Sequence, residues 1–217
     1  MPVLGYTPEH NAYPYNYMIG SEAQRRDAVD YLKLSLEMAK EMGAEFVLTS
    51  PANGGYLATY DQLWSRLEKN IQELGDYAAK LEIKLVVEAL TPYESNFFTR
   101  ANDLVELFRR VDNPYVVGMC DIVPPFVQHE SIMAYFDKLG NKMDHMHIID
   151  GENGSDTHLI PGEGNIPIKE MLYEMKRIGY DKTATLELVT NYINEPRFYA
   201  KRAIDNMREL MAEAGIV

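Results

Sequence analysis

Cysteine is almost absent from this chain, since its 217 residues include a single one, Cys120. An internal disulfide is therefore excluded, and the low cysteine count fits the reducing cytoplasm, where we expect the protein to act. The chain also lacks any apolar run close to the ~20 residues of a transmembrane helix, and its N-terminus has no signal-peptide pattern. We therefore expect no membrane partner.

Positive charge is scarce as well, because 21 lysines and arginines stand against 33 aspartates and glutamates and leave a formal net charge of −12. Nucleic-acid surfaces need a basic stripe that neutralises phosphates, so we expect no nucleic-acid partner. The same argument speaks against docking on anionic lipid. A cationic or neutral small molecule is a suitable ligand for such a chain.

What the sequence does contain is an alternation of short apolar runs and longer amphipathic runs. The runs of strand length, rich in β-branched or large apolar residues, are 3–6, 46–49, 85–88, 116–119, 145–149 and 184–188. Helical spacing of apolar residues predicts a helix after each run, near 21–43, 63–74, 104–111, 132–139, 171–178 and 197–214. Six βα units in a row predict a parallel sheet covered by helices.

Two α/β architectures compete, an open doubly wound sheet and a closed barrel, and the chain lacks the glycine-rich phosphate-binding motif of one kind of open sheet. A dinucleotide-binding sheet would carry a G-x-G-x-x-G after its first strand, and no strand here is followed by one. The favoured architecture is the (β/α)₈ TIM barrel, although such a barrel has eight strands and about 250 residues. We predict one domain over residues 1–217 that is two βα units short of this barrel.

Four successive predicted strands carry an ionisable residue near their C-terminal ends, and these residues are Glu88, Asp121, the pair His145 and His147, and Glu187. In a barrel these ends form one rim, where active sites lie. A single strand-end carboxylate more often caps the next helix, and one of two histidines on one strand face can be a satisfied core residue. Four such strands at one rim favour a functional site.

Three carboxylates at one barrel rim need a positive partner. In a low-dielectric site they would repel one another by several kcal/mol unless a cation joined them. Carboxylate oxygens and an imidazole nitrogen suit Mn²⁺, Co²⁺, Ni²⁺ or Mg²⁺ better than a thiolate-bound structural zinc. We predict that Glu88, Asp121, His147 and Glu187 bind one divalent metal ion.

The order Glu, Asp, His, Glu on successive strands resembles the xylose-isomerase-like superfamily of metal-dependent sugar isomerases and epimerases. "EALTPYES" is similar to the strand of ketose 3-epimerases in which a second glutamate, here Glu94, follows the metal-binding one, here Glu88. Longer strings, among them "GYTPEHNAYPYNYMIG", "SIMAYFDKLG", "SDTHLIPGEG" and "ELVTNYINEPRFYA", resemble the fructoselysine 3-epimerase family over nearly the whole chain. The resemblance implies a (β/α)₈ barrel whose first two βα units are lacking here.

The resemblance also implies an isomerase that inverts C3 of a ketosamine such as fructoselysine by two-base proton transfer through an enediolate. Glu88 and Glu187 would then be metal ligands and the two bases at once, while Asp121 and His147 fix the metal. Glu94 is expected to bind the substrate. We also predict Tyr6, at the end of the first strand, as a substrate-binding residue.

Two positions depart from the family enzymes that act on simple ketoses. Pro124 stands where those enzymes have a histidine, and Asn153 stands where they have an arginine. Both family residues help to hold the first hydroxyls and the carbonyl of the substrate, so their absence favours a modified sugar. His158, in "SDTHLIPGEG", is the predicted substitute, and Asp150 is a candidate for orienting a histidine or the loop.

Other functions stay open at this point. An aldose–ketose isomerase would share the metal constellation, and a barrel fragment that binds sugar without catalysis, or serves in assembly, fits the missing units. An endonuclease-IV-like enzyme would need more than the five histidines present and a basic face. We expect a homo-oligomer with a sugar or sugar-amine as its small-molecule partner.

Overall fold

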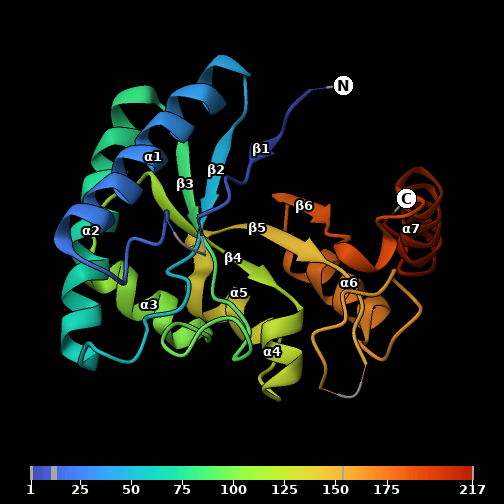
Figure 1. The fold of residues 1–217 in the computed structure, drawn as a ribbon. Coiled ribbons are helices and arrows are strands. Elements are labelled where there is room, and N and C mark those ends of the chain that lie inside the picture. The colour runs from blue at the N-terminus through green and yellow to red at the C-terminus, as the bar shows by residue number, and fades with distance from the viewer. Residues whose placement is uncertain (1, 11–13, 153, 217) are drawn as a thin grey trace.

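The computed structural model describes residues 2–10, 14–152 and 154–216. Its six strands are β1 (Gly5–Tyr6), β2 (Phe46–Thr49), β3 (Lys84–Val87), β4 (Val116–Asp121), β5 (Met143–Ile148) and β6 (Thr183–Leu186). They form one sheet in chain order, and every neighbouring pair is parallel. This order is that of a (β/α)₈ barrel and not of a doubly wound sheet, so the predicted fold class is confirmed, with six strands (Figure 1).

Helices follow the strands on one side of the sheet. They are α1 (Glu22–Glu41), α2 (Tyr60–Leu81), α3 (Ala101–Arg110), α4 (Val123–Val127), α5 (Met133–Leu139), α6 (Ile168–Ile178) and α7 (Pro196–Glu213), with 3₁₀ turns η1 (Gly140–Lys142) and η2 (Thr190–Tyr192). Capping boxes at Ser21 and Thr59 start α1 and α2, and Gly179, with φ of 73°, ends α6. The predicted helices are confirmed except that α4 was not expected.

The sheet separates two apolar regions, because successive side chains of a strand point to opposite faces. On the helix side a large cluster joins the strands to the helices, and it includes Val47, Leu85, Val116, Met146 and Ile148. On the barrel side a smaller cluster contains Phe46, Leu48, Val86, Val117 and Met119. The barrel-side residues form the floor below the strand ends that carry the predicted site.

The only tryptophan of the chain lies in an aromatic group between α2 and the segment that leads into α3. Trp64 is 4% exposed, and its ring centroid lies 5.3 Å from that of Phe97 and 6.3 Å from that of Tyr60. The Arg110 guanidinium stands 4.8 Å from the indole centroid, within cation–π range. This group fixes the α2–α3 wall of the molecule.

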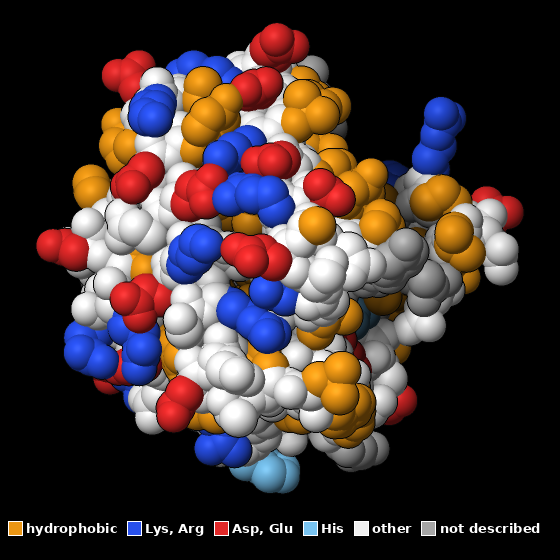
Figure 2. All heavy atoms as spheres, turned by 60° about the vertical axis from the view of Figure 1, so that its left-hand side comes forward, with side chains coloured by type: hydrophobic (Ala, Val, Ile, Leu, Met, Phe, Trp, Pro, Cys, Tyr) orange, Lys and Arg blue, Asp and Glu red, His pale blue; other side chains and the backbone are white. Residues whose placement is uncertain are grey.

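The sheet does not close on itself within the described residues. There, β1 pairs with β2 alone and β6 with β5 alone, so both edges are unpaired. On the face that comes forward in Figure 2, acidic and basic side chains are mixed, and ion pairs such as Arg26–Glu73 and Lys33–Glu73 join α1 to α2. Within the described part of the chain, no helix is both long and apolar enough to cross a bilayer.

Candidate metal centre and proton-transfer site

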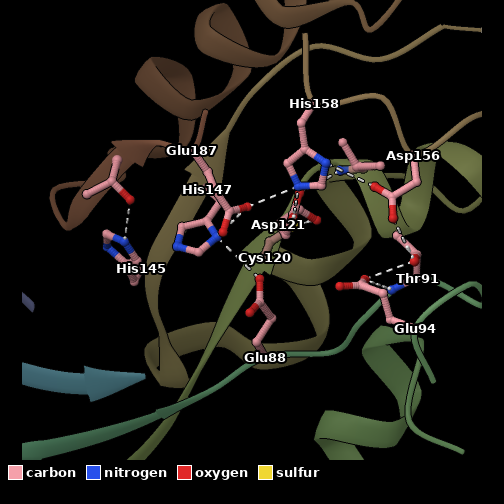
Figure 3. Close-up of polar contacts among 12 residues, drawn as sticks. Glu88, Thr91, Glu94, Cys120, Asp121, His145, His147, Asp156, His158 and Glu187 are labelled. Carbon is pink, nitrogen blue, oxygen red and sulfur yellow. Dashed lines mark hydrogen bonds and ion pairs between the residues drawn. The ribbon is translucent and has the colours of Figure 1, made fainter. Parts of the chain in front are cut away.

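Four side chains from consecutive strands converge at the C-terminal rim of the sheet (Figure 3). Glu88 directly follows β3, Asp121 is the last residue of β4, His147 lies in β5, and Glu187 directly follows β6. Asp121 and His147 are register partners, which places both at the same level of the sheet. The structure therefore brings together the four residues for which metal binding is predicted.

The centre of this group is the Nδ1 atom of His147. It lies 3.3 Å from Oε1 of Glu88 and 3.2 Å from Oε2 of Glu187, and the His147 side chain is 8% exposed. Despite these distances, Nδ1 has no hydrogen-bond partner of adequate geometry. Ligand atoms of Glu88, Asp121 and His147 lie within 4.8 Å of one another, and so do those of Asp121, His158 and Glu187.

The close packing of carboxylates and imidazoles in this group shifts the pKa values of its members. Burial raises the pKa of Asp121 well above its ordinary value, and the charges of Glu187 and Glu88 add to this. Burial alone would lower the pKa of His147, but Glu88 and Glu187 outweigh it and raise that pKa. Burial would likewise raise the pKa of Glu187, but contacts with His147 and His158 lower it.

These residues fit a divalent cation. An imidazole nitrogen that faces two carboxylate oxygens without forming a hydrogen bond is arranged as a ligand beside other ligands. The donor set of carboxylate oxygens and one imidazole nitrogen suits Mn²⁺, Co²⁺, Ni²⁺ or Mg²⁺. Asp121 also caps the following turn, because its Oδ1 accepts a hydrogen bond of 2.8 Å from the Val123 amide. Its Oδ2 is the oxygen that faces His158, at 4.0 Å.

His145, the other histidine of β5, is a satisfied core residue. Its Nδ1 lies 2.8 Å from the Thr183 hydroxyl and its Nε2 lies 3.1 Å from the Thr185 hydroxyl. Its ring packs 4.7 Å from the Phe46 ring, and burial lowers its pKa to about 4. Because His145 and His147 are two residues apart on β5, both point to the same face of the sheet, and the neutral imidazole of His145 lies beneath the candidate ligand His147.

His158 reaches the group from the loop between β5 and α6. Its Nε2 lies 3.2 Å from Oε2 of Glu187, and its Nδ1 lies 3.1 Å from Oδ1 of Asp156. Burial would lower the pKa of His158, but the contacts with Asp156 and Glu187 raise it to about 10. Sequence reasoning named His158 and missed Asp156, although its place two residues earlier in "SDTH" was a usable signal.

Glu94 is an exposed residue on the loop after β3, and its carboxylate is bound by Thr91. Its Oε2 accepts hydrogen bonds from the Thr91 hydroxyl, at 2.9 Å, and from the Thr91 amide, at 3.1 Å. Burial raises its pKa, and Asp156 and Glu88 contribute to the shift. Glu94 is therefore near the four-residue group but not part of it, and its role in binding substrate stays a prediction.

Asp150 fastens the loop that carries His158. Its side chain accepts hydrogen bonds from the amides of Gly151, Gly162 and Ile166, at 2.9, 2.9 and 3.0 Å. Its backbone exchanges two 2.7 Å hydrogen bonds with Leu159. The expectation that Asp150 orients the loop agrees with these contacts.

The remaining predicted residues lie elsewhere or outside the description. Tyr6 is the register partner of Val47 and packs against the helix-side cluster, so its placement gives no support to a substrate-binding role. Pro124 lies buried in the first turn of α4. Asn153 is outside the described residues. His10 is buried and contacts the Thr49 hydroxyl and the Ser50 amide, so its role is structural.

Fold and site together define a parallel α/β-barrel protein with a candidate metal centre at the C-terminal rim. The model of the xylose isomerase-like TIM barrel family matches residues 4–210. The chain therefore belongs to the xylose isomerase-like TIM barrel family, as its sequence motifs suggested.

Comparison with individual proteins shows which members of this family the chain resembles. The chain is 48% identical to the fructoselysine 3-epimerases of Shigella flexneri and Escherichia coli O157:H7 over 213 residues, which is 98% of this chain and 77% or 78% of those proteins. Because these proteins are epimerases, the predicted enzyme class, an isomerase of the sugar-epimerase type, is confirmed.

Solved structures with the same fold are more distant in sequence. A D-psicose 3-epimerase determined in the presence of D-fructose is 18% identical, with a TM-score of 0.75 over 86% of this chain and 64% of that one. The IOLI protein, solved with a bound zinc atom, is 19% identical, with a TM-score of 0.77 over 98% of this chain and 76% of that one. At these identities the likeness supports the fold alone.

Proposed function

We propose that this protein is a metal-dependent cytoplasmic epimerase that inverts C3 of a ketosamine such as fructoselysine, giving psicoselysine. The observation that carries the proposal is the position of Glu88 and Glu187. Two carboxylates from strands β3 and β6 approach one imidazole nitrogen of His147 to 3.3 and 3.2 Å. The 48% identity to fructoselysine 3-epimerases supports the choice of reaction.

Inversion at C3 requires that a proton leave one face of the sugar carbon and that another arrive on the opposite face. Glu88 and Glu187 are the two groups for this task, because each is a carboxylate at the same centre on a different strand. One of them takes the C3 proton and leaves an enediolate, and the other returns a proton to C3 from the other side. Run in reverse, the two residues exchange their roles.

A divalent cation would be held by Glu88, Asp121, His147 and Glu187, and it would supply polarisation of the C2 carbonyl of the substrate. The protein's own contribution is orientation. Asp121 is fixed by the Val123 amide, and Glu187 is fixed by His158. Glu88 is 7% exposed, so little bulk water surrounds its carboxylate while the proton is transferred.

The preference for a ketosamine over a free ketose rests on Pro124. This residue places a buried ring, with no hydrogen-bond donor, on the turn after Asp121. The site lacks, at that position, a polar group for the first hydroxyl of a simple ketose. A ketosamine has a substituted nitrogen on C1 instead of that hydroxyl, which agrees with the substitution.

The proposal is tested by incubating the metal-loaded protein with fructoselysine in D₂O and following C3 by NMR. We expect psicoselysine that carries deuterium at C3, because each base exchanges its proton with solvent between turnovers. Product without solvent deuterium would contradict the two-base mechanism. An aldose product, with solvent deuterium at its C2, would instead show an aldose–ketose isomerase. No turnover of any ketose would favour a non-catalytic sugar-binding protein.

A further inference from the structure

Asp156 is half-buried beside the candidate centre and has no part in the proton transfer described above. Its Oδ1 forms an ion pair with Nδ1 of His158 at 3.1 Å, and its Oδ2 accepts a hydrogen bond from the Thr91 hydroxyl at 3.1 Å. Oδ1 has no hydrogen bond of adequate geometry beyond this ion pair, and the Thr91 hydroxyl also lies 2.9 Å from Oε2 of Glu94. Asp156 is thus in contact with groups from two different loops. The side chains of Asp156 and His158 are 19% and 12% exposed. The ion pair between them is therefore shielded from most of the solvent.

The second nitrogen of the same imidazole contacts Glu187. The distance from His158 Nε2 to Glu187 Oε2 is 3.2 Å, so Asp156, His158 and Glu187 form a continuous chain of contacts (Figure 3). Glu88 is placed differently. Within the described residues, the only side-chain ion pair of the Glu88 carboxylate is with His147. The two candidate bases are consequently supported to different degrees.

The backbone at His158 indicates that this arrangement is imposed by its surroundings. His158 has φ of 45°, in the left-handed region that non-glycine residues rarely adopt. The next residue, Leu159, is locked to Asp150 by two backbone hydrogen bonds, and the carbonyl of Thr157 accepts one from the Asn191 side chain. The loop thus holds the imidazole toward Glu187 against local preference.

We infer that Asp156 is a positioning residue for C3 epimerisation, which acts through His158 to hold the Glu187 carboxylate in its reactive orientation. The inference rests on the proposed function, because it assigns Glu187 one of the two proton transfers. Partners that orient the groups around a metal site typically change activity by about 10–100-fold when removed. Asp156 is expected to fall in this range although it touches neither substrate nor metal.

The test compares Asp156→Ala with Asp156→Asn, with Glu152→Gln as the matched control. Asparagine keeps an oxygen where Oδ1 stands, whereas alanine removes it, and Glu152 is an exposed acid on the same loop. We expect Asp156→Ala to lower kcat with fructoselysine at least ~10-fold with little change in KM. Asp156→Asn should restore most of the lost kcat, and the kcat of Glu152→Gln should equal that of the parent protein.

A second kinetic measurement separates positioning from general damage. In D₂O, two quantities can be compared: the amount of deuterium in the recovered fructoselysine and the amount of psicoselysine formed. Their ratio depends on the relative rates of proton transfer by the two bases. Because the loss falls on Glu187 and not on Glu88, we expect Asp156→Ala to change this ratio. An unchanged ratio with a uniform loss of rate would overturn the inference. So would a loss of the single bound metal ion in Asp156→Ala, which would make Asp156 and His158 part of the cation site itself.

A structural measurement decides the inference even if fructoselysine is not the substrate. Crystal structures of the metal-loaded variants give the distance from His158 Nε2 to Glu187 Oε2 directly. We expect this distance to stay near its present value in Asp156→Asn and to exceed ~3.5 Å, the limit of a hydrogen bond, in Asp156→Ala. An imidazole that keeps its place in Asp156→Ala would overturn the positioning role whatever the substrate proves to be.

Discussion

At the scale of single residues, the strongest expectation concerns the two candidate bases. Replacing Glu88 or Glu187 by glutamine keeps the size of the side chain and removes its ability to carry a proton at C3. We expect each change to lower kcat at least ~10²-fold, the usual scale for general acid–base catalysis. Because both residues are also candidate metal ligands, metal content must be measured in the same samples. Full metal occupancy with undiminished kcat in either variant would contradict the assignment.

His145 gives a prediction of pH dependence that can be separated from catalysis. Its folded-state pKa is lowered to about 4 by burial, whereas in the unfolded chain it takes up a proton near its ordinary value of 6.5. Its neutral form thus contributes stability that is present above pH ~6.5 and is lost as the pH falls toward 4, by about 3 kcal/mol in all.

The check is denaturant unfolding of the metal-free protein and of His145→Asn across this pH range. The side-chain amide of asparagine can replace the contact with Thr183 but does not titrate. We expect the variant to lose less stability on acidification than the parent, and parallel curves would show that His145 is protonated in the fold.

Individual residues also show which parts of the candidate site could be predicted from the sequence. Glu88, Asp121, His147 and Glu187 were predictable because each stands at the end of an apolar run, and parallel strands place such ends together. Asp156 was not, because its role depends on the path of a loop that carries no periodic pattern. Tyr6 ends the first run in the same way, yet the pleat turns it to the helix side.

At the scale of elements, the loop between β5 and α6 depends on the close approach of the Gly164 backbone to the Asp150 side chain. A Cβ atom at Gly164 would lie 2.5 Å from Oδ1 of Asp150, the carboxylate that fastens the loop. We expect Gly164→Ala to displace Asp150, to destabilise the fold by about 1–3 kcal/mol, and to lower kcat because the loop carries His158. Urea unfolding and turnover measure the two effects.

Gly151→Ala is the control for this change, since a Cβ there meets its nearest neighbour at an ordinary 3.5 Å. Equal behaviour of the two alanine variants would show that the loop adapts around Asp150 and does not depend on Gly164.

Strands and long helices were predictable from apolar periodicity, although α2 (Tyr60–Leu81) extends well past the predicted range of 63–74. The short helix α4 was missed for a physical reason. Its sequence, VPPFV, contains two prolines, which a helix interior excludes but a first turn accepts because the amides there need no partner. A helix of one turn leaves too few positions for a period to be visible.

At the scale of the whole molecule, a metal bound by residues from four strands should stabilise the fold. The four ligands come together only in the native state, so a cation at 100 times its Kd adds about 2.7 kcal/mol. For a chain of this size we expect Mn²⁺ or Co²⁺ to raise Tm by roughly 5–10 °C, and a chelator to reverse the change. The measurement is differential scanning calorimetry, with Asp121→Asn as a variant that should respond weakly. Equal shifts in both proteins would place the cation elsewhere.

The unpaired edges of the sheet bear on association, and they motivate our expectation of a homo-oligomer. Strand edges present free amides and carbonyls that pair readily with another chain, and charges on an edge oppose this. We expect sedimentation equilibrium to give a mass above the 24.8 kDa of one chain at micromolar concentration. Ala184→Lys, on edge strand β6, should lower that mass, whereas Ala23→Lys, exposed on α1, should not. A monomer at all concentrations would contradict the expectation.

The position of Trp64 determines what an optical experiment on this protein can report. Tryptophan emission comes from one indole, packed between α2 and the segment before α3 under the Arg110 guanidinium. The signal therefore follows the wall made by those two helices and does not register the loop that carries His158 or helix α7. Circular dichroism averages over every helix. Superimposable melting curves from the two methods would mean that the distant C-terminal helices and the indole lose their structure in one cooperative step.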